Sequence, residues 1–449
     1  MRQPYRIESL TLKEIGVFEH THFDFPQIRS EEKDAEKAEI HIFTGPNGCG
    51  KSTVLYALAA VMNPDPNGGD ALVRKRYRDL DSQINFCFMG LEGEVGVGQV
   101  KSSGRSLWNN DNYHYVVDGG TNSCLYINRP YLNSSESFSS KSFEFAAFAY
   151  SGNRSRQSDF TLSAIQNVTA SPFEQALSFE QTVRQKVLAQ WIANNRTQAA
   201  LARAEYEKSE ADDYDLALLR ITNFIKDICN LDIRFQLKRN PLEVVINIDG
   251  LKVTFDALPE GLKSIITWIA DLALRLEAIP WKEQRDIFSQ PIILFLDEVD
   301  IHLHPKWQRR ILPAIQKLLP NAQVFVSTHS PFVVGSVEDA YVYRLPEPTK
   351  DVCRDPYIPE SIPAVPSAAG KSYQLILSEI FDVAEEFDVE TEQQLARFKV
   401  LKTAYLKAPE DDTELMSLAQ TLSAKGEELA TLVSLELRQV ARLLKNNQG

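Results

Sequence analysis

One stretch organises this chain: Ile42-Phe43-Thr44-Gly45-Pro46-Asn47-Gly48-Cys49-Gly50-Lys51-Ser52-Thr53. Its pattern predicts an apolar strand that ends at Phe43, a glycine-rich loop, and a helix that begins near Lys51. Glycines let such a loop turn its backbone N–H groups inward around a phosphate, and the helix N-terminus favours negative charge. We therefore predict a triphosphate site, with Lys51 at the β- and γ-phosphates and the Ser52 hydroxyl on Mg²⁺. The predicted ATP-binding residues are Gly45, Pro46, Asn47, Gly48, Cys49, Gly50, Lys51, Ser52 and Thr53.

A second Gly-Lys-Ser, at residues 370–372, lacks this context. Val365 stands where the first glycine of the loop pattern should be, and no apolar strand precedes it. Because the pattern indicates a phosphate loop only between a strand and a helix, we interpret the second copy as a chance match.

The composition is that of an ordinary globular protein with an acidic balance. At 449 residues the chain is long enough for two or three domains, and its formal net charge of −13 excludes a surface that is basic overall. The five cysteines lie far apart, which argues against a disulfide framework or a metal site and favours a reducing cytosol. No stretch approaches the length of about 20 apolar residues that a membrane helix needs, and none resembles a signal peptide. We therefore expect a cytoplasmic protein without a membrane contact.

The region before residue 230 alternates between strand and helix patterns. Residues 7–25 and 84–127 show strand periodicity, and residues 143–150 are typical of a buried strand. Residues 173–229 have apolar side chains at helical spacing, which predicts two or more long helices. We expect these helices to be an insertion between two halves of a nucleotide-binding domain.

A basic cluster follows the predicted loop helix, with Arg74, Lys75, Arg76 and Arg78 around Tyr77. Such side chains can grip a nucleic-acid backbone while Tyr77 stacks on a base. A charge run this short also occurs on the solvated face of a helix, so the sequence leaves both interpretations open.

The remaining candidate site residues stand at the ends of two further apolar strands. Residues 292–296 are apolar and end in Asp297 and Glu298, a pattern typical of a strand buried in the middle of a parallel sheet. Ligand crevices open at the carboxyl ends of such strands, so we expect Asp297 to hold Mg²⁺ and Glu298 to activate the attacking water. The strand at 323–327 leads to His329, which is placed to donate to the γ-phosphate or to that water. The structural alternatives are an acidic strand end that caps a helix and a histidine with a local hydrogen bond.

These motifs resemble those of the ATP-binding cassette (ABC) ATPases, in the branch that contains SMC, RecF and OLD proteins. The resemblance implies an α/β fold: a P-loop head with a mixed central sheet, a helical insertion and a C-terminal helical domain. It also implies that two copies sandwich ATP, each closing a signature stretch over the γ-phosphate held by the other. Residues 258–264, Leu-Pro-Glu-Gly-Leu-Lys-Ser, occupy the place of that signature, and Asp300 occupies the D-loop. The candidate signature contacts are Glu260, Gly261, Lys263 and Ser264.

The chain departs from the family pattern in three ways. Pro259 replaces the usual serine of the signature and has no N–H to offer, which predicts slow hydrolysis. No glutamine loop is matched, and we assign its role to residues 150–156, where Arg154 can sense phosphate. The helices within 173–229 are far too short for SMC-like arms. The resulting domain order is lobe I at 1–150, the helical insertion at 151–230, lobe II at 231–345, a proline-rich linker at 346–370 and a helical domain at 371–449.

The signature variant, the helix at 373–381 and the tail around 425–428 together are most similar to the PtuA ATPases of Septu anti-phage systems. The resemblance implies an ATP-hydrolysing subunit that regulates a partner HNH nuclease resembling PtuB, in some cases with a reverse transcriptase and its msDNA, or with phage DNA. Assembly would be a homodimer through the ATP sandwich, or a higher homo-oligomer. After Leu345 no nuclease motif is visible, so any cutting would fall to the partner. A RecF-like repair ATPase without a nuclease, and a nucleotide-locked scaffold with negligible hydrolysis, remain as alternatives.

Overall fold

The computed structural model of the chain describes residues 5–27, 37–62, 71–79, 81–89, 95–101, 115–118, 142–152, 162, 164–165, 171–179, 181–348, 358–409 and 411–447. The chain divides into two compact units, Met1–Ile376 and Leu377–Gly449. Among the described helices, none has the length and apolarity needed to cross a bilayer.

The larger unit is built on a six-stranded sheet with the order β15-β13-β3-β12-β11-β7. All of these strands except β15 run parallel to their neighbours, so their carboxyl ends meet at one edge. Every residue of β3, β7, β11 and β12 is buried, as expected for parallel strands that are covered on both faces. The strands are β3 (Glu39–Thr44), β7 (Ala146–Tyr150), β11 (Ile292–Leu296), β12 (Ala322–Ser327), β13 (Ala340–Arg344) and the antiparallel β15 (Val365–Pro366).

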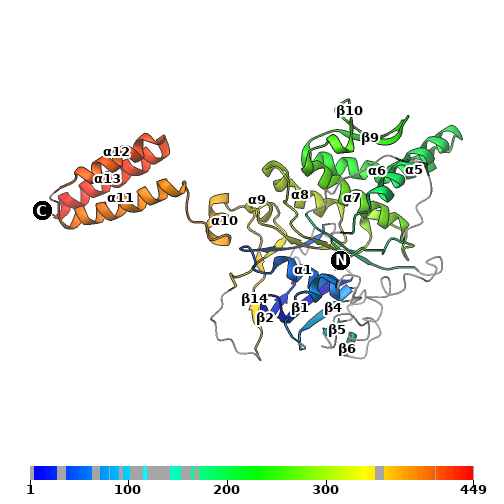
Figure 1. Cartoon of the computed structure of the whole chain (residues 1–449), viewed down its shortest axis with the longest axis horizontal. Helices are drawn as coiled ribbons and strands as arrows, with labels where there is room; N and C mark the ends of the chain where they lie inside the picture. Colours follow the sequence, from blue (N-terminus) through cyan, green and yellow to red (C-terminus); the bar gives the residue numbers. More distant parts are fainter. Residues whose placement is uncertain are drawn as a thin grey trace. The chain divides into compact units, whose positions relative to one another are not determined.

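A second, largely antiparallel sheet has the order β14-β2-β1-β4-β5-β6. Helix α1 (Lys51–Met62) contacts strands of both sheets, and Figure 1 shows it beside β1 and β4. Because it is covered on several sides, α1 is apolar around most of its circumference. The strands are β1 (Arg6–Ile15), β2 (Phe18–Asp24), β4 (Gln83–Met89), β5 (Val95–Lys101), β6 (Tyr115–Asp118) and β14 (Glu360–Ile362).

A buried charge cluster joins the two sheets behind the phosphate loop. Arg6 of β1 donates to Glu39 of β3 (Nε to Oε2, 3.2 Å) and to the Phe25 carbonyl (2.6 Å). His41 Nε2 lies 2.6 Å from Glu39 Oε1. Burial acts to raise the pKa of Glu39, but His41 and Arg6 outweigh it and the pKa falls, whereas burial lowers the pKa of His41. The charged carboxylate therefore anchors β3, which carries the phosphate loop, against β1.

The helical part of the larger unit consists of α5 (Gln185–Ala204) and α6 (Lys208–Cys229), which pack against each other, with α7 (Glu260–Ala278) and α8 (Pro305–Leu318) against α6 (Figure 1). Three antiparallel strands follow α6 in the chain, in the order β10-β9-β8. They are β8 (Ile233–Arg239), β9 (Leu242–Ile248) and β10 (Leu251–Thr254).

The predicted helices begin later than the pattern at residue 173 indicates. Residues 172–177 form turns, because tertiary contacts take up the backbone groups of this segment. Arg275 of α7 donates to the carbonyls of Pro172 (2.6 Å), Glu174 (2.9 Å) and Thr182 (2.6 Å). These bonds hold the segment against the core and override its helical periodicity.

Part of the predicted linker at 346–370 belongs to the two sheets. β14 pairs with β2 in parallel, and β15 pairs with the edge strand β13. Proline at a strand edge removes no needed ladder bond, which is consistent with Pro366 in β15. The segment therefore extends both sheets rather than only connecting two domains.

The smaller unit is a helical bundle. Its helices α11 (Val389–Lys407), α12 (Thr413–Ala424) and α13 (Glu427–Asn447) bury one apolar cluster that includes Phe398, Leu415, Leu422 and Val433. The division between the units falls within α10 (Tyr373–Ile380). The parallel and antiparallel sheets with C-terminal helices confirm the predicted α/β fold.

Candidate ATP site

The phosphate loop lies between β3 and α1, as predicted, and two of its glycines are sterically required. Gly50 has a φ of +98°, and a Cβ there would lie 2.6 Å from the Phe18 ring in β2. Gly45 has a φ of +147°, and a Cβ there would lie 2.6 Å from the Leu345 carbonyl oxygen. Neither position has room for a side chain.

Lys51 is held at the centre of this loop. Its Nζ donates to the carbonyls of Gly45 and Pro46, each at 2.9 Å, and the residue is only 7% exposed. Cys49 Sγ is 3.7 Å from the same Nζ, and burial raises the pKa of the Cys49 thiol. The two carbonyls thus fix the ammonium inside the loop, where a bound phosphate would lie.

The other predicted loop residues divide into an exposed tip and a buried base. Pro46, Asn47 and Gly48 are exposed, so their backbone is accessible to a ligand. Thr53 is buried, and a Cβ on Gly16 of the β1–β2 turn would lie 3.3 Å from its Cγ2. Thr53 therefore packs the loop helix against that turn.

The predicted metal ligands meet at the edge of the parallel sheet. Ser52 Oγ donates to Asp297 Oδ1 at 3.0 Å, although 245 residues separate them. A serine hydroxyl and a carboxylate are oxygen ligands of the kind that Mg²⁺ prefers. The two side chains therefore fit the predicted metal site.

Two side chains that the sequence analysis missed also bind Asp297. Ser327 Oγ donates to Oδ1 at 2.5 Å, and Tyr56 OH donates to Oδ2 at 3.3 Å. Signals for both exist in the sequence. Ser327 ends the strand beside β11, and Tyr56 is four residues after Ser52 on the same helix, which places both on one face. They orient the carboxylate toward the loop.

Glu298 is held in an unusual backbone conformation, with a φ of +49°. Its N–H donates to Ser327 Oγ at 2.7 Å. Burial raises the pKa of Glu298, and the negative charges of Asp297 and Asp300 raise it further. A carboxylate with a raised pKa suits a general base.

The segment after β7 lies against this glutamate. A Cβ on Gly152 would be 2.5 Å from the Glu298 carbonyl oxygen, so the two backbones are in close contact. Gly152 is thus adjacent to Glu298, and the role assigned to 150–156 remains a prediction. Arg154 lies outside the described residues.

His329 follows β12, which lies between β3 and β11. The side chain is exposed at this edge. Burial of part of the ring and the charge of Lys51 lower the pKa of His329, which keeps the imidazole neutral at pH 7. A neutral imidazole has one N–H to donate, as the predicted contact with a γ-phosphate requires.

The signature stretch opens α7. Pro259 precedes the helix without a side-chain cap, and its carbonyl accepts from Leu262 N and Lys263 N at 3.0 Å each. Glu260 and Lys263 form an ion pair at 2.9 Å on this end of the helix. Ser264, predicted to contact ATP on a second copy, is only 5% exposed. Gly261 is buried as well, so the contacts of Glu260, Gly261, Lys263 and Ser264 with the ATP of a second copy remain a prediction.

The basic cluster is engaged with the protein itself. The Arg76 guanidinium lies 4.6 Å from the centre of the Tyr56 ring and donates to the Leu72 carbonyl at 2.7 Å. Arg78 pairs with Glu14 at 3.5 Å, and Lys75 is exposed. The side chain of Arg74 lies outside the described residues. Arg76 thus contacts Tyr56, which in turn donates to Asp297. The nucleic-acid contact of the basic cluster remains a prediction.

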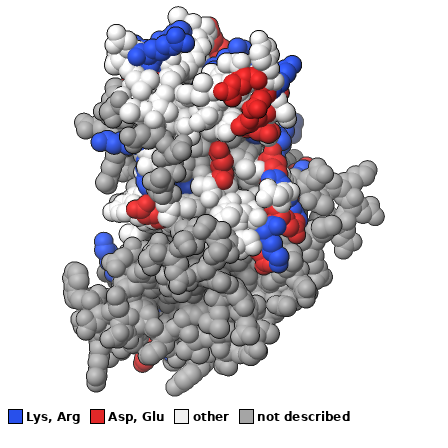
Figure 2. All heavy atoms as spheres, turned by 90° about the vertical axis from the view of Figure 1, so that its right-hand side faces the viewer, with Lys and Arg blue, Asp and Glu red and all other residues white. Residues whose placement is uncertain are grey.

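On the face that Figure 2 shows, Asp and Glu side chains gather at the upper right, among several Lys and Arg side chains. Exposed carboxylates at the turn of the α5–α6 hairpin are Glu205, Glu207, Glu210 and Asp212. Arg203 and Lys208 are exposed at the same turn, so charges of both signs lie there.

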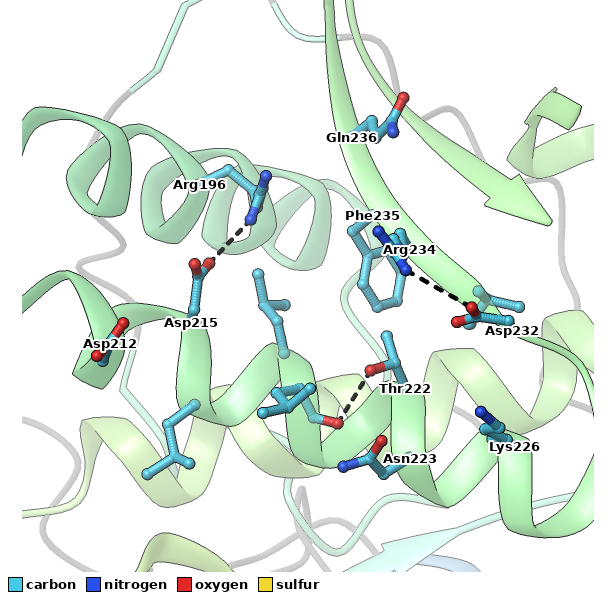
Figure 3. Close-up of a pocket in the computed structure, with 14 residues that line it drawn as sticks. Arg196, Asp212, Asp215, Thr222, Asn223, Lys226, Asp232, Arg234, Phe235 and Gln236 are labelled. Atoms are coloured by element: carbon cyan, nitrogen blue, oxygen red, sulfur yellow. Dashed lines mark hydrogen bonds and ion pairs between the residues drawn. The ribbon is translucent and has the colours of Figure 1, made fainter. Parts of the chain in front are cut away.

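A hollow of about 680 Å³ lies between α5, α6 and β8, away from the phosphate loop. Arg196 of α5 and Asp215 of α6 point toward each other across it and form an ion pair at 2.9 Å (Figure 3). Asp232 and Arg234 form a second pair at 3.6 Å. None of the predicted ATP-site residues lines this hollow.

Two family models match the chain, and both describe AAA domains. One, described as an AAA domain, covers residues 9–198. The other, an AAA domain whose description names the AbiEii toxin of type IV toxin–antitoxin systems, covers residues 126–335. Together they span the site from the phosphate loop to His329. Over these residues the chain is similar to AAA domains.

The chain is similar to the retron Ec83 probable ATPase of Escherichia coli, with 22% identity across 98% of this chain and 88% of that protein. It is also similar to the Septu protein PtuA of Bacillus thuringiensis, with 33% identity across 26% of this chain and 33% of PtuA. A solved structure, the SMC head domain from Thermotoga maritima, is 15% identical with a TM-score of 0.41, and the match covers 76% of this chain and 96% of that domain. The retron and Septu relatives confirm the family that the motifs indicated.

Proposed function

We propose that this ATPase is the regulatory subunit of a bacterial anti-phage complex and controls a partner HNH nuclease. Its similarity to a retron ATPase along almost the whole chain, and to PtuA over a shorter stretch, supports this class of function. The observation that carries the proposal is the contact between Ser52 and Asp297, because it brings together the two predicted Mg²⁺ ligands from distant parts of the chain.

Each residue of the site would have a separate role in ATP hydrolysis. The loop N–H groups and Lys51 would bind the β- and γ-phosphates. Ser52 and Asp297 would hold Mg²⁺, which neutralises phosphate charge when bound. Glu298 would accept a proton from the attacking water, and neutral His329 would donate to the γ-phosphate.

The second copy of the chain would complete the site. The N-terminus of α7 has no side-chain cap, so its dipole and N–H groups would favour the γ-phosphate held by the other copy. Pro259 contributes no donor there, so we expect slow turnover. A homodimer, or an oligomer built from such dimers, follows from this arrangement.

Co-expression with the neighbouring gene tests the proposal. We expect a nuclease to co-purify, and plasmid cutting by the complex to change with ATP in the wild type and to ignore ATP in the Lys51→Ala variant. Absence of a nuclease partner, together with ATP-dependent binding to gapped DNA, would instead support a RecF-like repair ATPase. Unchanged ATP turnover in Glu298→Gln would support a nucleotide-locked scaffold.

A further inference from the structure

Gln308, on the first turns of α8, uses its whole side-chain amide to join two loops of the site. Its Nε2 donates to the carbonyls of Asp300 (3.2 Å) and Leu303 (3.0 Å), in the loop that follows β11 and Glu298. Its Oε1 accepts from Ser330 Oγ (2.7 Å), in the loop that follows β12. One half-buried side chain thus makes three hydrogen bonds to the two loops.

On the β12 side, the bond reaches the residue next to His329. Ser330 Oγ also accepts from Phe332 N (3.1 Å) and Val333 N (3.4 Å). A hydroxyl has a single proton, so that proton goes to Gln308. Gln308 therefore sets the position of the loop that presents His329.

On the β11 side, Gln308 holds the loop by its backbone. Asp300 Oδ1 is buried and has no hydrogen-bond partner among the described residues, so this carboxylate oxygen does not anchor the loop. Between the two held carbonyls lies His302, which has a φ of +63°. A Cβ on Gly261 would lie 2.5 Å from the His302 carbonyl oxygen, so this loop is in close contact with the start of α7.

We propose that Gln308 is a positioning residue for ATP hydrolysis, a role that rests on the proposed ATP site. It couples the loop of His329, which belongs to the site of its own chain, to the Asp300 loop and the Gly261 end of α7, which face the nucleotide of a second copy. Gln308 touches no ATP-site side chain that binds phosphate or metal. Its loss therefore slows turnover and leaves nucleotide binding intact.

The same helix supplies a matched control. Gln316 lies eight residues further along α8, and its Nε2 likewise donates to two backbone carbonyls, those of Ala38 (3.3 Å) and Asp339 (3.2 Å). These carbonyls precede β3 and β13, at the opposite ends of the strands from the site. Replacing either glutamine removes two comparable backbone contacts, but only Gln308 reaches the catalytic loops.

The test compares Gln308→Leu and Gln316→Leu in the full chain by Tm, by the Kd for ATPγS, and by kcat and KM for ATP. We expect both variants to lower Tm, and only Gln308→Leu to lower kcat, by about tenfold or more, with KM and Kd within about threefold of wild type. A kcat within twofold of wild type, or equal losses in the two variants, would overturn the proposal.

Two further variants keep the test decisive if Gln308→Leu fails to fold. Gln308→Glu keeps the size of the side chain but cannot donate to the two carbonyls at pH 8, so we expect a similar loss of kcat. Ser330→Ala should lower kcat, and the double variant with Gln308→Leu should be no slower than the worse single variant, because both changes break one connection. Additive losses would contradict the coupling. A wild type without ATPase activity would refute the proposed function instead.

Discussion

The same three residues, Gly-Lys-Ser, occur twice in this chain and do different things. At 50–52 the lysine is buried inside a loop, and the serine hydroxyl contacts the carboxylate that ends β11. At 370–372 the lysine is exposed, and Ser372 Oγ accepts from Leu375 N at 3.2 Å at the start of α10. The first copy lies in the proposed nucleotide site, whereas the second begins a short helix.

The difference comes from the surroundings rather than from the tripeptide. Gly50 is crowded by Val17 of the β1–β2 turn and by Phe18 of β2, whereas a Cβ placed on Gly370 would have no neighbour within 4 Å. A phosphate loop needs a strand before it and an acidic strand end beside it, and only the first copy has both.

We expect the largest effect on ATP hydrolysis when the two lysines, Lys51 and Lys371, are replaced and compared. Lys51→Ala removes the cation that faces the phosphates, so we expect ATP hydrolysis to fall by about 10³-fold or more. Lys371→Ala changes an exposed side chain, and we expect activity within about twofold of wild type. Phosphate release at saturating ATP measures both. Equal losses in the two variants would erase the distinction.

Glu298→Gln sharpens the account of the first site. It removes the proposed general base, and we expect kcat to fall by about 10²–10⁴-fold while ATPγS binds with unchanged affinity. Binding of the analogue by titration and single-turnover hydrolysis separate the two effects. Loss of binding without a change in the chemical step would contradict the assigned role.

The pH dependence of turnover reports the same carboxyl group. Because burial and the charges of Asp297 and Asp300 raise the pKa of Glu298, the base loses its proton only above the ordinary glutamate value of about 4.3. We expect kcat to rise by about tenfold per pH unit below that pKa and then to level off. If kcat is already constant with pH down to the ordinary glutamate pKa, then the pKa of Glu298 is not raised or Glu298 is not the base.

The raised pKa also affects stability. A carboxyl whose pKa is raised on folding favours the folded state at pH below its unfolded value, and this contribution is lost as pH rises through the folded pKa. Above that pKa the charged Glu298 opposes folding. We therefore expect Glu298→Gln to have a Tm at or above that of wild type at pH 8, measured without nucleotide.

The two glycines give a smaller contrast. Both have positive φ, +98° for Gly50 and +86° for Gly370, so alanine costs about 1–2 kcal/mol at either position. At Gly50 the contact with Phe18 adds an overpacking cost of about 1–3 kcal/mol. The free energy of unfolding, measured with denaturant, should therefore be clearly lower for Gly50→Ala than for Gly370→Ala. The reverse order would show that the loop relaxes freely.

The smallest effect belongs to Ser372. Ser372→Ala removes the hydrogen bond to Leu375 N at the start of α10, which we expect to cost about 1 kcal/mol of local stability. ATP turnover should not change. Thermal unfolding and phosphate release, measured together, check both statements, and a loss of turnover would mean that this second copy contributes to the site after all.

The motifs at strand ends could be predicted from sequence because their positions follow from topology. Once 42–43, 292–296 and 323–327 are identified as parallel strands, Lys51, Asp297 and His329 must come together at one edge. Ser327 and Tyr56 were missed because their signals are positional: one ends the strand beside β11 and the other follows Ser52 by one helical turn, and their contacts with Asp297 appear only in the folded structure.

Other predictions failed where tertiary contacts outweigh local patterns. The turns at 172–177 have helical spacing, but Arg275 binds the carbonyls of this segment. The proline-rich linker contains too little periodicity to reveal that β14 and β15 join two sheets.

The central claim is that one nucleotide site per chain is built around Lys51. Calorimetric titration with ATPγS and Mg²⁺ tests it most directly, in the wild type, Lys51→Ala and Lys371→Ala. The account predicts one bound nucleotide per chain for the wild type and Lys371→Ala, and no measurable binding for Lys51→Ala. One nucleotide per chain in Lys51→Ala, or loss of binding in Lys371→Ala, would contradict it.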